Sequence, residues 1–220
     1  MFRQALAICK KDFQSELRTR YSLNGLAMFI IVVISIIKFS LGEEKLSNEL
    51  HAGLLWIIIF FANSSGLSRV FVAEEDRGTS YALKLIADSK SVLLGKLIFN
   101  TSLSFLINFF VVFLFLVTMD VNIKSFGLFV LTLVLGNLGL SSVMTIIAAL
   151  ISKSSSKGTL YPVLSFPLLL PLMLTAINST WLTIEGTDIG GLMGEIQIMV
   201  SYSAVLVTAS FMLFGLIWND

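Results

Sequence analysis

The stretch Leu-Ile-Phe-Asn-Thr-Ser-Leu-Ser-Phe-Leu-Ile-Asn-Phe-Phe-Val-Val-Phe-Leu-Phe-Leu-Val-Thr-Met, residues 97 to 119, contains no charged side chain. An apolar helix of about 20 residues is long enough to cross the roughly 30 Å hydrocarbon core of a bilayer. Similar blocks recur along the chain, without the polar and apolar alternation that strands of a membrane barrel need. The sequence therefore predicts an all-α membrane protein.

We expect six transmembrane helices, at residues 22–41, 52–72, 97–119, 126–150, 159–178 and 197–218. Together with an amphipathic helix over residues 1–21, this six-span bundle (22–218) would form a single transmembrane domain over residues 1–220. The composition agrees, because 56% of the residues are hydrophobic and only 13% are charged. A net charge of +1 gives no sign of nucleic-acid binding, and the single cysteine, Cys9, excludes a disulfide within the chain.

The basic residues are unevenly placed. Of the 15 Lys and Arg residues, five lie in residues 1–20, five in residues 69–96 and two in residues 153–157, while Lys38, Lys45 and Lys124 fall near the other ends of the spans. Short loops rich in Lys and Arg stay in the cytoplasm. We therefore expect a multi-pass protein with both termini cytoplasmic.

The N-terminal segment has helical periodicity. Its apolar residues recur at steps of three and four, while basic and polar residues take the other faces; the apolar set is Phe2, Leu6, Cys9, Phe13 and Leu17. Such a helix would lie along the cytoplasmic headgroups, and the same face could also dock a soluble partner.

Polar residues within the third span fall on one stripe, Asn100, Ser104 and Asn108. Two interpretations stay open for them. Polar side chains in membranes often hydrogen-bond between packed helices, and they can also line a substrate path.

All three prolines, Pro162, Pro167 and Pro171, fall in the fifth span. Because each interior proline removes a backbone donor, we expect this helix to be kinked or broken and to serve as a moving element. After it, residues 179–196 are polar and glycine-rich, which predicts an outer loop that either connects flexibly or rests at the interface. The lone His51 at the outer end of the second span is more typical of a wet polar residue than of a metal or haem ligand.

Catalytic motifs are missing from the sequence. Gly95-Lys96 is followed by Leu97 and lacks the upstream glycine of a phosphate-binding loop, and no zinc-protease or serine-hydrolase motif is present. We therefore expect no catalytic residues, no metal site and no bound cofactor in this chain. The chain is predicted not to be an enzyme.

The charged stretch Glu-Glu-Asp-Arg-Gly-Thr-Ser-Tyr-Ala-Leu-Lys-Leu, residues 74 to 85, stands between the second and third spans. Gly78 permits a sharp turn, and Thr79 can cap a short helix that runs through Leu83 to Ile86. Asp88 or Ser89 can cap the next helix. A capped helix with exposed Tyr, Leu and Ile side chains is suited to a groove on another protein.

The sequence at this point resembles a known family. Phe-Val-Ala-Glu-Glu-Asp-Arg-Gly-Thr-Ser (71–80), the later Gly95-Lys96 pair and Leu-Ser-Phe-Pro-Leu-Leu-Leu-Pro-Leu (164–172) are similar to ABC-2 export permeases. Within that class the chain most resembles the haem-exporter B permease of cytochrome c maturation. Length, span number and the leading amphipathic helix agree, so the resemblance covers essentially the whole chain.

This resemblance implies a bacterial inner-membrane complex with several partners. They are a second copy of the chain, an ABC ATP-binding subunit that hydrolyses ATP, a haem-handling membrane protein, a small single-span subunit and a periplasmic haem chaperone. Haem would be cargo of the complex, either passed by the permease or released with its chaperone; we favour release, because no ligand set for iron is visible. A permease for a lipid, polysaccharide or drug, and a scaffold without transport, are the alternatives.

The resemblance also implies a site for coupling to the ATPase. We expect the acids to meet basic residues of that subunit and Leu83 to anchor the contact. The residues expected to carry coupling are Glu74, Glu75, Asp76, Arg77, Gly78, Thr79 and Leu83.

Overall fold

The computed structural model describes residues 1–18, 21–42, 46–76, 78–152 and 157–219. These residues form helices and no strands: α1 (Phe2–Arg18), α2 (Tyr21–Leu41), α3 (Asn48–Leu67), α4 (Arg69–Asp76), α5 (Ser80–Ile86), α6 (Ser89–Met119), α7 (Phe126–Ile151), α8 (Lys157–Glu185) and α9 (Ile189–Asn219). Six helical segments of the described chain are long and apolar enough to cross a membrane: Leu23–Leu41, Asn48–Asp76, Ser89–Met119, Phe126–Ile151, Leu160–Glu185 and Ile189–Gly215. The predicted all-α fold with six spans is confirmed.

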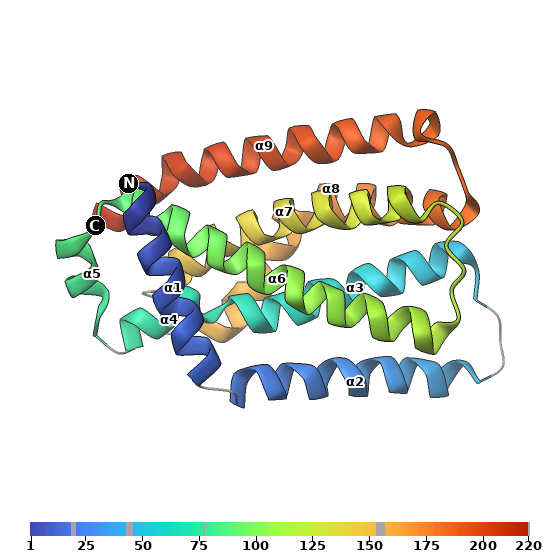
Figure 1. The fold of residues 1–220 in the computed structure, drawn as a ribbon, viewed down its shortest axis with the longest axis horizontal. Coiled ribbons are helices and arrows are strands. Elements are labelled where there is room, and N and C mark those ends of the chain that lie inside the picture. The colour runs from blue at the N-terminus through green and yellow to red at the C-terminus, as the bar shows by residue number, and fades with distance from the viewer. Residues whose placement is uncertain (19–20, 43–45, 77, 153–156, 220) are drawn as a thin grey trace.

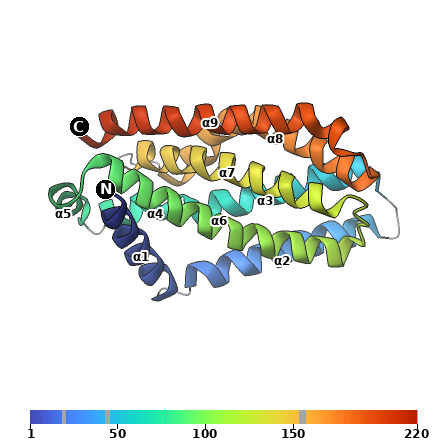
Figure 2. The same ribbon diagram turned by 45° about the horizontal axis from the view of Figure 1, so that its top comes forward.

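The long helices α2, α3, α6, α7, α8 and α9 run side by side along the long axis of the bundle (Figure 1). Shorter helices gather at one end, where α1 crosses the bundle and α4 and α5 lie beyond the end of α3. Both chain termini lie at this end, as both views show (Figures 1 and 2). The end that holds α1, α4, α5 and the termini is called the terminal end below.

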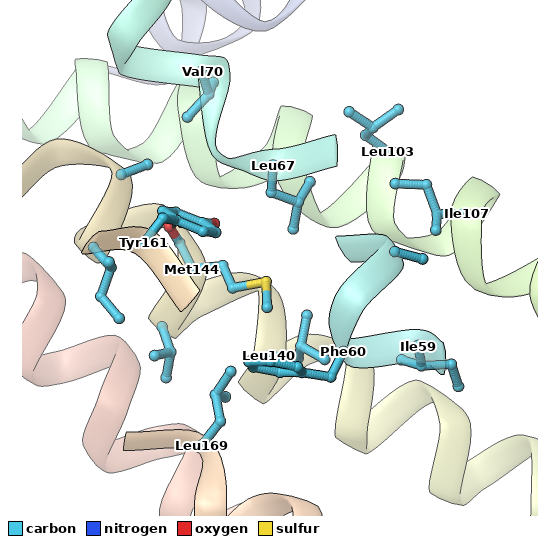
Figure 3. Packing of buried hydrophobic residues seen from close by; sticks show 14 of the residues in the cluster. Ile59, Phe60, Leu67, Val70, Leu103, Ile107, Leu140, Met144, Tyr161 and Leu169 are labelled. Atoms are coloured by element: carbon cyan, nitrogen blue, oxygen red, sulfur yellow. Dashed lines mark hydrogen bonds between the residues drawn. The ribbon is translucent and has the colours of Figure 1, made fainter. Parts of the chain in front are cut away.

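Helix α7 forms the centre of the bundle and packs against α3, α6, α8 and α9. Figure 3 shows Leu140 and Met144 of α7 beside Phe60 of α3 and beside Tyr161 and Leu169 of α8, all members of the buried hydrophobic cluster. Helices α2 and α9 lie at opposite edges and bury much less of their surface (Figure 2). Their apolar side chains therefore face outward, which suits a bilayer as solvent.

A glycine lets α7 approach α3 closely. The Trp56 indole ring lies directly over Gly136, where any Cβ atom would overlap the ring. The indole Nε1–H donates to Thr180 Oγ1 at 2.8 Å, which fixes the ring against α8. Small residues at helix interfaces allow this kind of packing in membranes.

One prediction about the last third of the chain is wrong. The predicted outer loop over residues 179–196 is mostly helix, because α8 runs to Glu185 and α9 begins at Ile189. Gly186, at a φ of +90°, ends α8, and Asn178 Nδ2 donates to Glu195 Oε1 at 2.5 Å across the two helices. Tertiary contacts of this kind outweigh the low helix propensity of glycine.

The fifth span was predicted to be kinked or broken, and it is not broken. Pro162, Pro167 and Pro171 all lie inside the continuous helix α8. Hydroxyl groups next to the prolines bond to the helix backbone: Ser165 Oγ donates to the Tyr161 carbonyl at 2.8 Å, and Thr175 Oγ1 to the Pro171 carbonyl at 3.0 Å. Neither bond goes to a carbonyl four residues before a proline, so these hydroxyls do not replace the missing backbone donors.

The N-terminal segment is a helix, as predicted, but its buried face differs from the predicted apolar stripe. Ala5, Ile8, Cys9 and Asp12 are buried, whereas Phe2, Leu6 and Leu17 are exposed. Helix α1 packs on α6, where a Cβ atom on Gly95 would lie 2.7 Å from the Ala5 carbonyl oxygen. Helix α1 is thus a docked part of the bundle.

Candidate functional site

The turn between α4 and α5 has the backbone geometry that the sequence predicts. Gly78 adopts a φ of +66°, which glycine reaches without strain. Its N–H donates to the Glu75 carbonyl at 3.0 Å, and the Thr79 N–H donates to the Glu74 carbonyl at 3.0 Å. This pair of bonds is a Schellman motif, which ends α4 and turns the chain sharply into α5.

Thr79 occupies the N-cap position of α5, but its side chain does not cap that helix. Its Oγ1 hydroxyl donates instead to Glu74 Oε2 at 2.6 Å. Thr79 and Glu74, two predicted site residues, are therefore in direct contact across the turn. Asp88, one of the two predicted capping residues, lies at the N-cap position of α6, but its side chain makes no cap hydrogen bond.

Helix α5 stands away from the bundle and exposes apolar side chains (Figure 1). Tyr81 is 74% exposed, Leu85 is 89% exposed and Ile86 is 75% exposed. Leu83, the predicted anchor for a partner, is instead half-buried and packs against the hydrophobic core. The apolar surface that α5 offers to a partner is therefore centred on Leu85.

A buried cluster of charges lies beneath this segment. Lys96 of α6 is only 1% exposed, and its Nζ lies 3.0 Å from Asp12 Oδ2 and 3.1 Å from Glu74 Oε1. Lys96 Nζ also donates to the Val70 carbonyl at 2.8 Å. Lys11 forms further ion pairs with Glu74 and, at 3.3 Å, with Asp12. The Lys96 cluster, comprising Lys11, Asp12, Glu74 and Lys96, thus joins α1, α4 and α6.

Sequence reasoning missed three members of the Lys96 cluster: Lys11, Asp12 and Lys96. Lys96 directly precedes the charge-free block 97–119, and it was considered only among the basic residues of 69–96 and as part of the Gly95-Lys96 pair. Its burial depends on carboxylates 84 and 22 residues away, on α1 and α4. The neighbouring Gly95 is the one local signal, because its missing side chain brings α1 close to α6.

A cavity of about 400 Å³ separates α5 from the bundle. Leu83 and Ile86 line it from α5, Phe99 and Leu103 line it from α6, and members of the Lys96 cluster form a polar wall. Helix α5 thus has free space on its inner side.

The other predicted residues of this segment lie near the turn. Glu75 is half-buried near the end of α4, and Asp76 is exposed at its last position. Arg77 lies outside the residues that the structure describes.

The polar stripe of α6 lies inside the bundle. Asn63 Nδ2 of α3 donates to Asn108 Oδ1 at 2.6 Å, and Asn108 Nδ2 donates to Asn137 Oδ1 of α7 at 2.7 Å. Ser104 Oγ lies 2.5 Å from Asn63 Oδ1, and Asn100 Nδ2 donates to a threonine hydroxyl of α7 at 2.9 Å. These bonds join α3, α6 and α7.

His51 lies in the first turn of α3, at the end of the bundle opposite α5 (Figure 1). Its Nδ1 is 3.1 Å from the Ser47 carbonyl oxygen, and its ring meets Phe115 edge-on. Among the described residues, no group of three or more His, Cys, Asp and Glu side chains is placed to hold a metal ion.

Six candidate spans among the described residues define a multi-span helical membrane protein, with the exposed apolar helix α5 outside the bundle. Comparison with protein families gives the particular family: the model described as CcmB protein matches residues 3–214, and the chain therefore belongs to the CcmB family. Members of this family are membrane permeases of haem export and cytochrome c biogenesis, which makes the chain a multi-pass inner-membrane protein. The family implies an ABC transporter with an ATP-binding partner. A comparison with curated proteins found no match.

Proposed function

We propose that the chain, as one transmembrane domain, couples ATP hydrolysis on a separate subunit to haem delivery for cytochrome c maturation. In this proposal α5 lies in the cytoplasm and docks the ATP-binding subunit. The observation that carries the proposal is the exposed apolar surface of Tyr81, Leu85 and Ile86 on a helix tied to the bundle next to the Lys96 cluster. Exposed aromatic and aliphatic side chains on a short helix are suited to a groove of a partner protein.

The Lys96 cluster supplies a route for movement from α5 into the membrane. Glu74 contacts Thr79 at the start of α5, Lys96 on α6 and Lys11 on α1. A push on α5 would therefore displace α1 and α6 through Glu74, and the cavity behind Leu83 leaves room for the motion. Rigid helices joined by buried ionic contacts can carry such coupling. Glu75 and Asp76 would meet basic residues of the ATP-binding subunit.

We favour a mechanism in which ATP hydrolysis drives release of a haem-loaded periplasmic chaperone. The polar groups of Asn63, Asn108 and Asn137 bond to one another between helices, which supports a packing role for the stripe of α6. The prolines of α8 would let that helix bend as the bundle moves. Two copies of the chain would work with the haem-handling membrane protein and the small single-span subunit.

Replacing Leu85 tests the docking role of α5. We expect the Leu85→Asp variant to abolish recovery of the ATP-binding subunit when the complex is purified through this chain. A charge at the centre of an apolar contact loses the burial and adds a desolvation cost. The matched control is Phe126→Asp, an exposed apolar residue at the opposite end of the bundle, which should leave recovery unchanged. Normal recovery with Leu85→Asp would reject the docking role.

A further inference from the structure

A second hollow, of about 390 Å³, opens on the side of the bundle at the junction of α3 and α4. Its lining residues from α3 and α4 recur at steps of three and four, so they share one face of these two helices. Pro162 of α8 forms the opposite wall. The complete lining is Phe61, Ser64, Ser65, Ser68, Arg69, Val72 and Pro162.

The hydroxyl of Ser64 is buried and has no hydrogen-bond partner among the described residues. The residue is 6% exposed, and its Oγ makes no hydrogen bond to the described residues. Other hydroxyls in the spans donate to the carbonyl four residues earlier, as Ser102 does at 2.8 Å and Ser142 at 2.7 Å. A buried polar group without a hydrogen-bond partner lowers the stability of the fold. A bound group that fills the hollow and hydrogen-bonds to Ser64 would recover that stability.

Arg69 stands at the rim of the same hollow. Arg69 is exposed and also lines the cavity behind α5, but no carboxylate of the described residues lies within 4 Å of its guanidinium. Ser65 is also exposed, and the hydroxyl of Ser68 donates to the Ser65 carbonyl at 3.5 Å. The hollow thus offers several hydroxyls and one cation, and its described lining has no acid. That donor set suits a phosphate group.

The depth of the hollow indicates where the phosphate comes from. Ser64 to Ser68 lie 16 to 20 residues after the first residue of α3, Asn48. At about 1.5 Å per residue this is about 24 to 30 Å along the helix. The hydrocarbon core is roughly 30 Å thick, so a core that begins at the first residue of α3 ends beside the hollow, where the lipid headgroups of the terminal side begin.

We propose that this hollow binds the headgroup phosphate of an anionic phospholipid. Arg69 donates to the phosphate oxygens, the hydroxyls of Ser64, Ser65 and Ser68 complete the site, and Phe61 lies beside the start of an acyl chain. A zwitterionic lipid would bring a cation next to Arg69 with no acid to receive it. The bound lipid would link the α3–α4 junction to α8 at Pro162. This proposal does not depend on the docking role of α5.

Native mass spectrometry of the purified full chain tests the site. We expect phosphatidylglycerol to remain bound while phosphatidylcholine does not. Arg69→Gln should weaken phosphatidylglycerol binding about tenfold, the loss of one charge-assisted hydrogen bond. The matched control is Lys90→Gln, which removes an exposed cation from the first turn of α6 and should change nothing. Ser64→Ala should weaken binding and leave the melting temperature of the lipid-free protein the same or higher.

Three outcomes would overturn the proposal. The first is equal binding of the two lipids, or unchanged binding by Arg69→Gln. The second is displacement of phosphatidylglycerol by inorganic phosphate, which would assign the site to a soluble anion. The third is an Arg69→Gln variant that no longer forms a dimer but still binds phosphatidylglycerol. That result would mean that this face contacts a second copy of the chain.

Discussion

At the scale of single residues, Lys96 is the cation on which the buried carboxylates of Asp12 and Glu74 depend. We predict that Lys96→Met lowers the free energy of unfolding by about 3 kcal/mol, because the two carboxylates then share the half-exposed Lys11 as their cation. Thermal unfolding in detergent measures this loss. Lys10→Met is the control, since Lys10 is exposed on the same end of the molecule. Equal melting temperatures for the two variants would contradict the role given to Lys96.

Cys9 offers a natural probe of the contact between α1 and α6. Burial, and next the charge of Asp12, raise the pKa of its thiol above the ordinary value. The reactive thiolate is therefore scarce at neutral pH, and it becomes more abundant only as the pH rises toward that raised pKa. We predict slow maleimide labelling of the native protein, rapid labelling in denaturant, and faster native labelling in Lys96→Met. Fast labelling of the native wild type would show that α1 is not held against α6.

The sequence indicated some of these residues and not others. Glu74, Gly78 and Thr79 could be selected because a charged turn between two apolar blocks is a local signal. Lys96 and Asp12 could not, since their contact joins helices that are far apart in the chain. Leu83 was selected as an anchor from the family resemblance, but the direction in which α5 faces depends on how the whole segment packs.

At the scale of helices, the close approach of α3 and α7 depends on Gly136. We predict that Gly136→Ala lowers the free energy of unfolding by about 2 kcal/mol, because the new methyl group must displace the Trp56 ring, which is held by Thr180. Gly127→Ala on the same helix has open space and should be neutral or slightly stabilising. Melting curves of both variants check the difference, and similar destabilisation of both would contradict this account of the packing.

The presence of the six transmembrane helices was predictable from the sequence, but the residues at which α8 ends and α9 begins were not. The uninterrupted apolar blocks were enough to place the six spans. Residues 179–196 were predicted to be a loop because they are polar and rich in glycine, yet Thr180 bonds to Trp56 and Asn178 bonds to Glu195. Contacts of this kind extend α8 and α9 well beyond their apolar cores, and a single sequence does not reveal them.

At the scale of the whole molecule, a substitution should be able to uncouple ATP hydrolysis from haem delivery while the ATP-binding subunit stays bound. We predict that Glu74→Gln keeps the ATP-binding subunit bound and hydrolysing ATP but reduces mature cytochrome c about tenfold in cells. The amide cannot neutralise Lys96 and Lys11, so movement of α5 no longer reaches α1 and α6 with the same force. Subunit recovery, ATPase rate and haem-stained cytochrome c are measured together. Unchanged cytochrome c would indicate that the chain acts as a scaffold.

Membership of the CcmB family was predictable from a few residues, because the charged turn at 71–80 and the prolines at 164–172 stand out in an apolar chain. The Lys96 cluster that joins α1, α4 and α6 was not predictable, because it depends on where α1 packs against the bundle. Helix α1 was expected to lie along the membrane surface, a prediction that the ion pairs do not test; in the structure Lys11 and Asp12 of α1 belong to the Lys96 cluster.

The most direct test of the central proposal is photocrosslinking in native membranes. A photoreactive benzoylphenylalanine replaces Leu85 on α5 in one variant and Phe126 at the opposite end of the bundle in another. We predict that position 85 crosslinks to the ATP-binding subunit and that position 126 does not. A crosslink to that subunit from position 126, or none from position 85, would contradict the assignment of α5 as the cytoplasmic docking helix.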